Sequence, residues 1–117
     1  MADLNKILLI GRVGVKPELH TSAAGNHITN LSVATNFVSQ KDGAERKETE
    51  WHRVVVHGKS AESCAKYLEP GRLVFVEGRM QSRTWTDRDG NDRFEREVVA
   101  RRVDFLSSVP ASERAAA

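Results

Sequence analysis

The stretch TEWHRVVVHGKSAESCAKYLEPGR, residues 49–72, changes its periodicity halfway, and that change decides the fold. Its first part, up to His57, alternates between two kinds of side chain, as a β-strand does. Its second part carries apolar residues at the i, i+3, i+4 and i+7 positions of one helical stripe. These residues are Ala61, Cys64, Ala65 and Leu68. We therefore expect a strand and then a short helix, which Ser60 caps and Pro70-Gly71 ends.

Two segments before this stretch also predict strands. Residues 4–13 form a dense apolar run, which indicates a strand buried on both faces. Residues 27–37 alternate between apolar and polar side chains, as a half-buried strand does. The polar segment 38–48, around Asp42-Gly43, predicts a long and mobile hairpin loop.

After the helix, the pattern returns to strand at residues 73–85, where Gly78 marks a bend or bulge, and again at 94–106. The resulting order of three strands, one helix and two strands is that of the OB-fold. We expect an all-β domain over residues 1–106, a five-stranded Greek-key barrel with one helix between the third and fourth strands. Residues 107–117 lack periodicity and predict a flexible tail or linker.

The composition is that of an ordinary globular domain. Of the 117 residues, 39% are hydrophobic and 29% are charged, which excludes a disordered chain. No stretch approaches the ~20 apolar residues of a membrane span. The net charge of +2 permits a nucleic-acid partner without requiring one. The single cysteine, Cys64, cannot form an internal disulfide, and the first residues lack a secretory pattern, so we expect a cytoplasmic protein.

Patterns typical of catalysis, nucleotide binding and metal binding are incomplete. Gly58-Lys59-Ser60 matches the end of a phosphate-binding loop, but Arg53 stands where that loop needs its first glycine. The acidic turn at residues 87–92 lacks the spacing of a calcium loop, and the four histidines lack zinc-ligand spacing. We therefore predict no catalytic residue, no metal and no cofactor.

Aromatic and cationic side chains share faces on two of the predicted strands. On the third strand, alternation places Trp51, Arg53 and His57 on one face, and His52 with two valines on the opposite, core-directed face. On the fourth strand, one face carries a second tryptophan beside cations. The residues of that face are Glu77, Arg79, Gln81, Arg83 and Trp85.

Such faces suit a single-stranded nucleic acid, because bases stack on aromatic rings and phosphates pair with cations. Phe37 adds an aromatic where the second strand meets a loop that contains Lys41, Arg46 and Lys47. Stacking contributes about 1–3 kcal/mol per base and accepts every base, so we expect binding without sequence preference. The alternative interpretation is that each tryptophan packs on a partner subunit or closes the barrel end.

Six short motifs, in order across residues 3–105, resemble those of the bacterial single-stranded DNA-binding proteins. They are Asn5-Lys6-Ile7-Leu8-Leu9-Ile10-Gly11, Thr49-Glu50-Trp51-His52-Arg53-Val54-Val55, Gly58-Lys59, Tyr67-Leu68 with Pro70-Gly71, Val76-Glu77-Gly78, and Trp85-Thr86-Asp87. The block that begins at Thr49 and the last motif are specific to that family. The resemblance implies a non-catalytic OB-fold homotetramer. Its partner would be single-stranded DNA in replication, recombination and repair, within the bacterial cytoplasm and nucleoid.

The resemblance also implies roles for individual residues. Bases would stack on Trp51 and Trp85, on Phe37 as the aromatic nearest to a family position in the loop, and on His57, where the family usually has phenylalanine. His52 matches a position at the subunit interface. Phosphate contacts are implied for Arg53, Lys59 and Arg83, and the residue pattern adds Arg79, Lys41, Arg46 and Lys47.

One departure from the family lies at the C-terminal end. Family members usually continue into an acidic tip that recruits replication and repair enzymes, whereas this sequence stops at Ser112-Glu113-Arg114-Ala115-Ala116-Ala117. Recruitment of protein partners through a tail therefore stays open. Two other functions fit the same pattern: a dimeric primosomal accessory protein of this fold, which usually has fewer stacking aromatics, and a scaffold that binds protein through the tryptophan faces.

Overall fold

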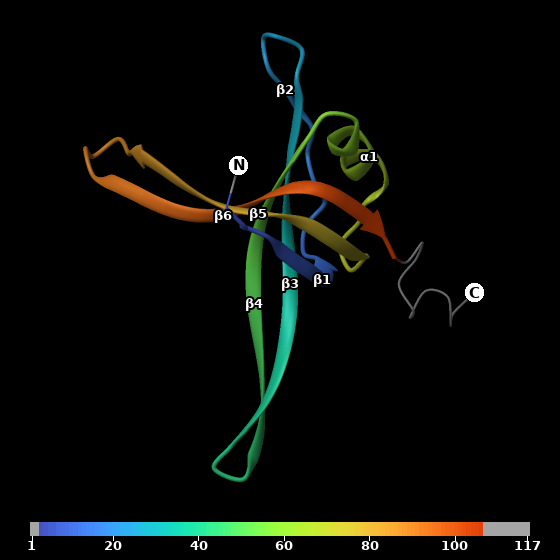
Figure 1. The fold of residues 1–117 in the computed structure, drawn as a ribbon, viewed down its shortest axis with the longest axis vertical. Coiled ribbons are helices and arrows are strands. Elements are labelled where there is room, and N and C mark those ends of the chain that lie inside the picture. The colour runs from blue at the N-terminus through green and yellow to red at the C-terminus, as the bar shows by residue number, and fades with distance from the viewer. Residues whose placement is uncertain (1–2, 107–117) are drawn as a thin grey trace.

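The computed structural model describes residues 3–106, whose strands form a single sheet that closes into a barrel (Figure 1). The elements are β1 (Ile7–Val13), β2 (His20–Thr21), β3 (His27–Lys41), β4 (Ala44–His57), α1 (Lys59–Tyr67), β5 (Leu73–Thr86) and β6 (Asp92–Phe105). Neighbouring strands follow the order β1-β5-β6-β4-β3-β2. Because β1 also pairs with β3, through Arg12–Ala34 and Val13–Val33, the sheet closes on itself. The predicted OB-fold, with its helix ahead of the last two strands, is confirmed.

The barrel interior is filled by alternate residues of the strands. The buried strand residues of this core are Leu9, Val13, Leu31, Val33, Val54, Val56, Val74, Val76 and Val98. Helix α1 adds Ala61 and Cys64, and Leu68 follows directly after it. The period of two on β3, β4 and β5 and the helical stripe on α1 thus predicted the residues that these elements contribute to the core, since each pattern reports which side chains share a face.

The two ends of α1 are held by backbone and by a distant lysine. Its N-cap is Gly58, at φ 73° and without a side-chain capping hydrogen bond, so the predicted cap by Ser60 is wrong. Glycine adopts this left-handed backbone without steric cost. At the other end, the Nζ of Lys16 donates to the carbonyl oxygens of Ala65 (3.1 Å) and Leu68 (3.2 Å). These contacts satisfy carbonyls that the helix leaves without partners.

The outer face of β1 departs from the prediction. Leu9 and Val13 are buried, but Leu8 and Ile10 are each 59% exposed, so β1 is not buried on both faces. A barrel has one interior, and a strand in its wall turns only alternate residues toward that interior. The outer face of β1 therefore exposes two apolar side chains, followed by Arg12.

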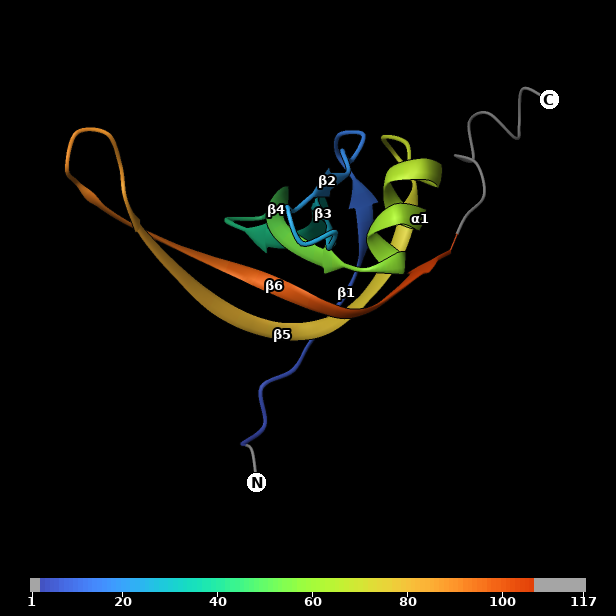
Figure 2. The ribbon, with the colours of Figure 1, turned by 90° about the horizontal axis from the view of Figure 1, so that it is seen from above.

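Two long hairpins extend from the barrel, one made by β3 and β4 and the other by β5 and β6 (Figures 1 and 2). β3 and β4 pair without interruption out to Lys41–Ala44, and Asp42 and Gly43 form the turn with positive φ values of 55° and 77°. This is the conformation of a two-residue hairpin turn. The long loop predicted for residues 38–48 is therefore wrong. Beyond the core neither face of the hairpin is apolar, so the sequence lacks the alternation that marks a strand.

The pairing of β5 with β6 contains a bulge beside Gly78, as predicted. Glu77 pairs with Arg102 and Gly78 pairs with Ala100, so Arg101 is the extra residue on β6. A Cβ atom on Gly78 would collide with the backbone of β6, which explains the glycine. Because the bulge lies on β6, the alternation of β5 continues unbroken past Gly78.

The remaining segments add three observations. The segment between the predicted strands at residues 4–13 and 27–37 contains the short strand β2, which pairs with β3 through His20–Ile28 and Thr21–His27. Residues 107–117, for which a flexible tail is predicted, lie outside the described residues. Between residues 3 and 106, no helix has the length and apolar character needed to cross a membrane.

Candidate nucleic-acid interface

Five of the twelve predicted site residues lie on one continuous outer face that crosses three neighbouring strands, which we call the β4–β6–β5 face. Strand β6 pairs in parallel with β4 through Val54–Val98 and Val55–Val99, and antiparallel with β5. Residues level with one another on paired strands point to the same side of the sheet. The outward residues are Trp51, Arg53 and Val55 on β4, Arg93, Glu95 and Glu97 on β6, and Arg79, Gln81, Arg83 and Trp85 on β5.

Trp51 rests on the backbone at the end of β1. A Cβ atom placed on Gly14 would lie 2.5 Å from Cζ3 of the indole and 2.8 Å from Cη2, so only glycine leaves room for the ring there. The Gly14 amide donates to the Ser32 carbonyl at 2.9 Å, which fixes this backbone against β3. Trp51 remains 59% exposed. It is thus an aromatic surface that is supported on one side and open to solvent on the other.

Trp85 lies beside two arginines near the outer end of the β5–β6 hairpin. The Arg83 guanidinium lies 5.1 Å from the centre of its ring, which is a cation–π contact. Arg93, level with Trp85 on β6, donates from Nε to Asp87 at 2.8 Å. The Asn91 amide and this Arg93 bond hold the pKa of the Asp87 carboxyl below its ordinary value. Trp85 is 39% exposed, so an aromatic ring with the Arg83 cation beside it is open to solvent.

A chain of polar side chains crosses the β4–β6–β5 face beside Trp51. Arg79 donates to the Gln81 Oε1 at 3.3 Å, and the Gln81 Nε2 donates to the Glu97 Oε1 at 3.1 Å. Glu97 is only 5% exposed and its other oxygen lies 3.5 Å from the Arg53 Nε. The Arg53 Nη1 also lies 3.5 Å from Glu95. Arg53, predicted as a phosphate contact, is therefore already paired with two carboxylates.

Phe37 does not share a face with Trp51. Trp51 is opposite Ala34 on β3, whereas Phe37 is an odd number of residues away and opposite Glu48, so its side chain points to the other side of the hairpin. Phe37 is 65% exposed. The three cations predicted near it are split by the same register. Lys47 lies on the Trp51 side, and Lys41 and Arg46 lie on the Phe37 side.

The remaining predicted residues lie at three separate places. His57 is exposed at the end of β4, on the same side of that strand as Trp51. His52 is half-buried on the opposite side, and its Nε2 is 2.9 Å from the Thr35 Oγ1. Lys59 is the first residue of α1 and lines a hollow with residues 103–105 of β6. The structure thus groups Trp51, Arg53 and the β5 residues, and places Lys59 elsewhere.

The sequence reasoning missed the contribution of β6. Glu95 and Glu97 meet Arg53 only because β6 inserts between β4 and β5, and a parallel pairing of distant segments leaves no local sequence signal. Phe94 was also missed. It is 63% exposed and opposite Thr84, on the side of the β5–β6 hairpin away from Trp85. Phe94 and Arg96 are two residues apart on β6, as Trp51 and Arg53 are on β4. The same pattern of an aromatic and a cation on one strand face could therefore have identified Phe94 from the sequence.

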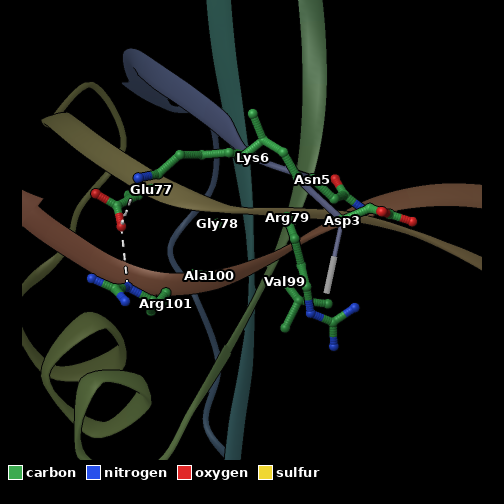
Figure 3. Close-up of a pocket in the computed structure, with 10 residues that line it drawn as sticks. Asp3, Asn5, Lys6, Glu77, Gly78, Arg79, Val99, Ala100 and Arg101 are labelled. Carbon is green, nitrogen blue, oxygen red and sulfur yellow. Dashed lines mark ion pairs between the residues drawn. The ribbon is translucent and has the colours of Figure 1, made fainter. Parts of the chain in front are cut away.

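A hollow behind the bulge is lined by the N-terminal segment, β5 and β6 (Figure 3). In it Glu77 forms ion pairs with Arg101 at 3.1 Å and with Lys6 at 3.8 Å. Asn5 exchanges two hydrogen bonds with the Met80 backbone, of 2.9 and 3.0 Å, which extend the β1–β5 ladder. These contacts tie the N-terminal segment to the barrel. Within the described part of the chain, no group of three or more His, Cys, Asp or Glu residues could hold a metal ion.

Comparison with known proteins agrees with this geometry. Residues 4–106 match the Single-strand binding protein family. The Plasmodium falciparum SSB in complex with ssDNA has a TM-score of 0.83 and 32% identity, covering 92% of this chain and 98% of that one. A deletion mutant of the single-stranded DNA binding protein from Thermus aquaticus has a TM-score of 0.78 and 35% identity over 89% of this chain. This chain spans only 51% of that protein. The chain belongs to the single-strand binding protein family.

Proposed function

We propose that this chain binds single-stranded DNA without sequence preference, and that it protects such DNA in replication, recombination and repair. The observation that carries the proposal is the β4–β6–β5 face, where two exposed tryptophans lie on one surface together with Arg79 and Arg83 of β5. Bases of any kind stack on such rings, and cations beside them pair with the phosphate backbone. The similar Plasmodium protein was captured with ssDNA, which supports the same ligand here.

In this proposal Trp51 and Trp85 stack bases, and His57 extends the stacking surface along β4. Arg79, Arg83 and Lys47 provide phosphate contacts on the same side. Phe37, with Lys41 and Arg46, adds contacts on the other side of the β3–β4 hairpin, and Lys59 adds one at α1. A DNA strand that uses all of these residues therefore has to bend around the hairpin. The site accepts any DNA sequence, because these contacts do not read the edges of the bases.

We also infer that the chain acts as a homotetramer. Leu8 and Ile10 form an exposed apolar surface on β1, and within residues 3–106 β3 pairs with only the last two residues of that strand. An exposed apolar surface beside an open strand edge favours association with another copy. His52 would contribute to such an interface. Light scattering of wild type and of the Leu8→Glu, Ile10→Glu double variant tests this inference. A monomeric wild type would contradict it, and a dimer would favour the primosomal alternative.

The DNA-binding proposal is tested by titrating the protein with oligo(dT) while recording tryptophan fluorescence. We expect quenching, and an affinity loss of roughly 5- to 150-fold in Trp51→Ala and in Trp85→Ala, from about 1–3 kcal/mol of stacking. Tyr67→Ala is the matched control, because the exposed fraction of Tyr67, 53%, lies between those of Trp85 and Trp51, but Tyr67 lies on α1 against Lys66. Absence of quenching, or unchanged affinity when both tryptophans are replaced, would contradict the proposal and favour a protein-binding scaffold.

A further inference from the structure

The cluster around Arg53 carries more negative than positive charge. Arg53 is the only cation among its three members, and Glu95 and Glu97 are carboxylates. The cluster borders Trp51, since a shallow hollow is lined by Trp51, Arg53 and Glu95 together with Asn30 and Ser32. A phosphate that follows a base stacked on Trp51 therefore approaches a site whose formal charge is −1.

The two carboxylates differ in how firmly they are held. Glu97 is 5% exposed and accepts a hydrogen bond from Gln81, so it is a fixed part of the sheet surface. The side chain of Glu95 is 34% exposed and that of Arg53 is 37% exposed. Glu95 is therefore the partner that can move into solvent when another anion arrives.

The contacts of Arg53 are also longer than good hydrogen bonds. Both of its ion pairs measure 3.5 Å, outside the usual range of about 2.7–3.2 Å for N–H···O bonds. The Arg53 Nε and the Glu97 Oε2 are buried without a hydrogen-bond partner among the described residues. A phosphate cannot reach the buried Nε, but the Arg53 side chain is 37% exposed, and phosphate oxygens form short, bidentate bonds with an accessible guanidinium.

We propose that Glu95 is a built-in competitor of the DNA phosphate at Arg53. In free protein Glu95 neutralises the outer side of the guanidinium. When single-stranded DNA binds at Trp51, a phosphate displaces the Glu95 carboxylate, while Glu97 keeps Arg53 in place. One anion replaces another at this position, so the contact releases little counterion and limits both affinity and salt dependence. This inference rests on the proposed DNA binding.

The test uses Glu95→Gln, which removes the charge and keeps the size of the side chain. We expect affinity for oligo(dT) to rise roughly two- to fivefold at low salt, the range of a partly exposed ion pair. The plot of log affinity against log salt should steepen by about 0.7, the value of one added phosphate contact on a single strand. From about 50 to 200 mM salt, the variant should lose about 2.6-fold more affinity than wild type.

Two controls separate competition from simple charge removal. Glu45→Gln removes a carboxylate on the same side of β4 as Trp51, but at the outer end of the hairpin, opposite Gln40. It should change affinity and slope less than Glu95→Gln does. In an Arg53→Gln background, Glu95→Gln should have no further effect.

Each other outcome overturns the inference. An equal gain in Glu45→Gln, or a gain that persists without Arg53, shows a general charge effect. An unchanged or weaker affinity in Glu95→Gln shows that Glu95 positions Arg53 for DNA instead of competing with it. If Arg53→Gln fails to fold, the comparison of Glu95→Gln with Glu45→Gln decides between competition at Arg53 and a general charge effect. Failure of the wild type to bind oligo(dT) at all contradicts the proposed function itself.

Discussion

Replacing Gly14 by alanine should weaken DNA binding while leaving the fold intact. The new methyl group would lie 2.5 Å from Cζ3 of Trp51 and 2.8 Å from Cη2, whereas carbon atoms pack at about 3.5–4.0 Å. The ring must therefore move by about 1 Å. It can do so because Trp51 is 59% exposed, and Gly14 is not among the glycines with positive φ, so alanine fits its backbone.

The expected loss follows from the displaced ring. Holding Trp51 away from its preferred rotamer costs about 0.5–1.5 kcal/mol, which corresponds to roughly 2- to 12-fold in affinity for oligo(dT). The assay is a fluorescence titration of Gly14→Ala, Trp51→Ala and the double variant, with urea unfolding as a check on stability. We expect Gly14→Ala to add nothing in the Trp51→Ala background, because both changes act on the same ring. Additive losses, or unchanged affinity in Gly14→Ala, would refute the reasoning.

Three further predictions concern the barrel and its outer turn. Gly11→Ala should destabilise the fold by about 1–3 kcal/mol in urea unfolding, because its Cβ would meet the Ala34 carbonyl on the backbone that closes the barrel. Burial raises the pKa of the Cys64 thiol from 9.0 to about 11, so the unfolded thiol ionises first. Stability should fall as pH rises from about 9 to 11, and Cys64→Ala should remove that part of the pH dependence. The Asp87 carboxyl, with its pKa lowered below 3.8, stabilises the β5–β6 turn above that pH and stops doing so as pH falls through the lower value. Asp87→Asn should abolish the corresponding change in amide-proton exchange of the turn.

The sequence by itself determined which side chains share a face. Alternation on β4 and β5 separated the core valines from Trp51, Arg53 and Trp85, and the 3.6-residue period located the buried stripe of α1. The order of these elements was sufficient for the OB-fold. These features depend on the residue pattern within each element and on the order of the elements. Both can be read directly along the sequence.

Only the tertiary structure decided which faces are covered, how far the strands pair and which strands are neighbours. It left Leu8 and Ile10 uncovered, although the apolar run around them indicated burial on both sides. It extended β3 and β4 through a polar segment, because cross-strand hydrogen bonds do not require an apolar face. It also inserted β6 between β4 and β5, which brought Glu95 to Arg53. Pairing between distant segments depends on how the whole barrel closes. A local sequence pattern does not indicate which distant strands will pair.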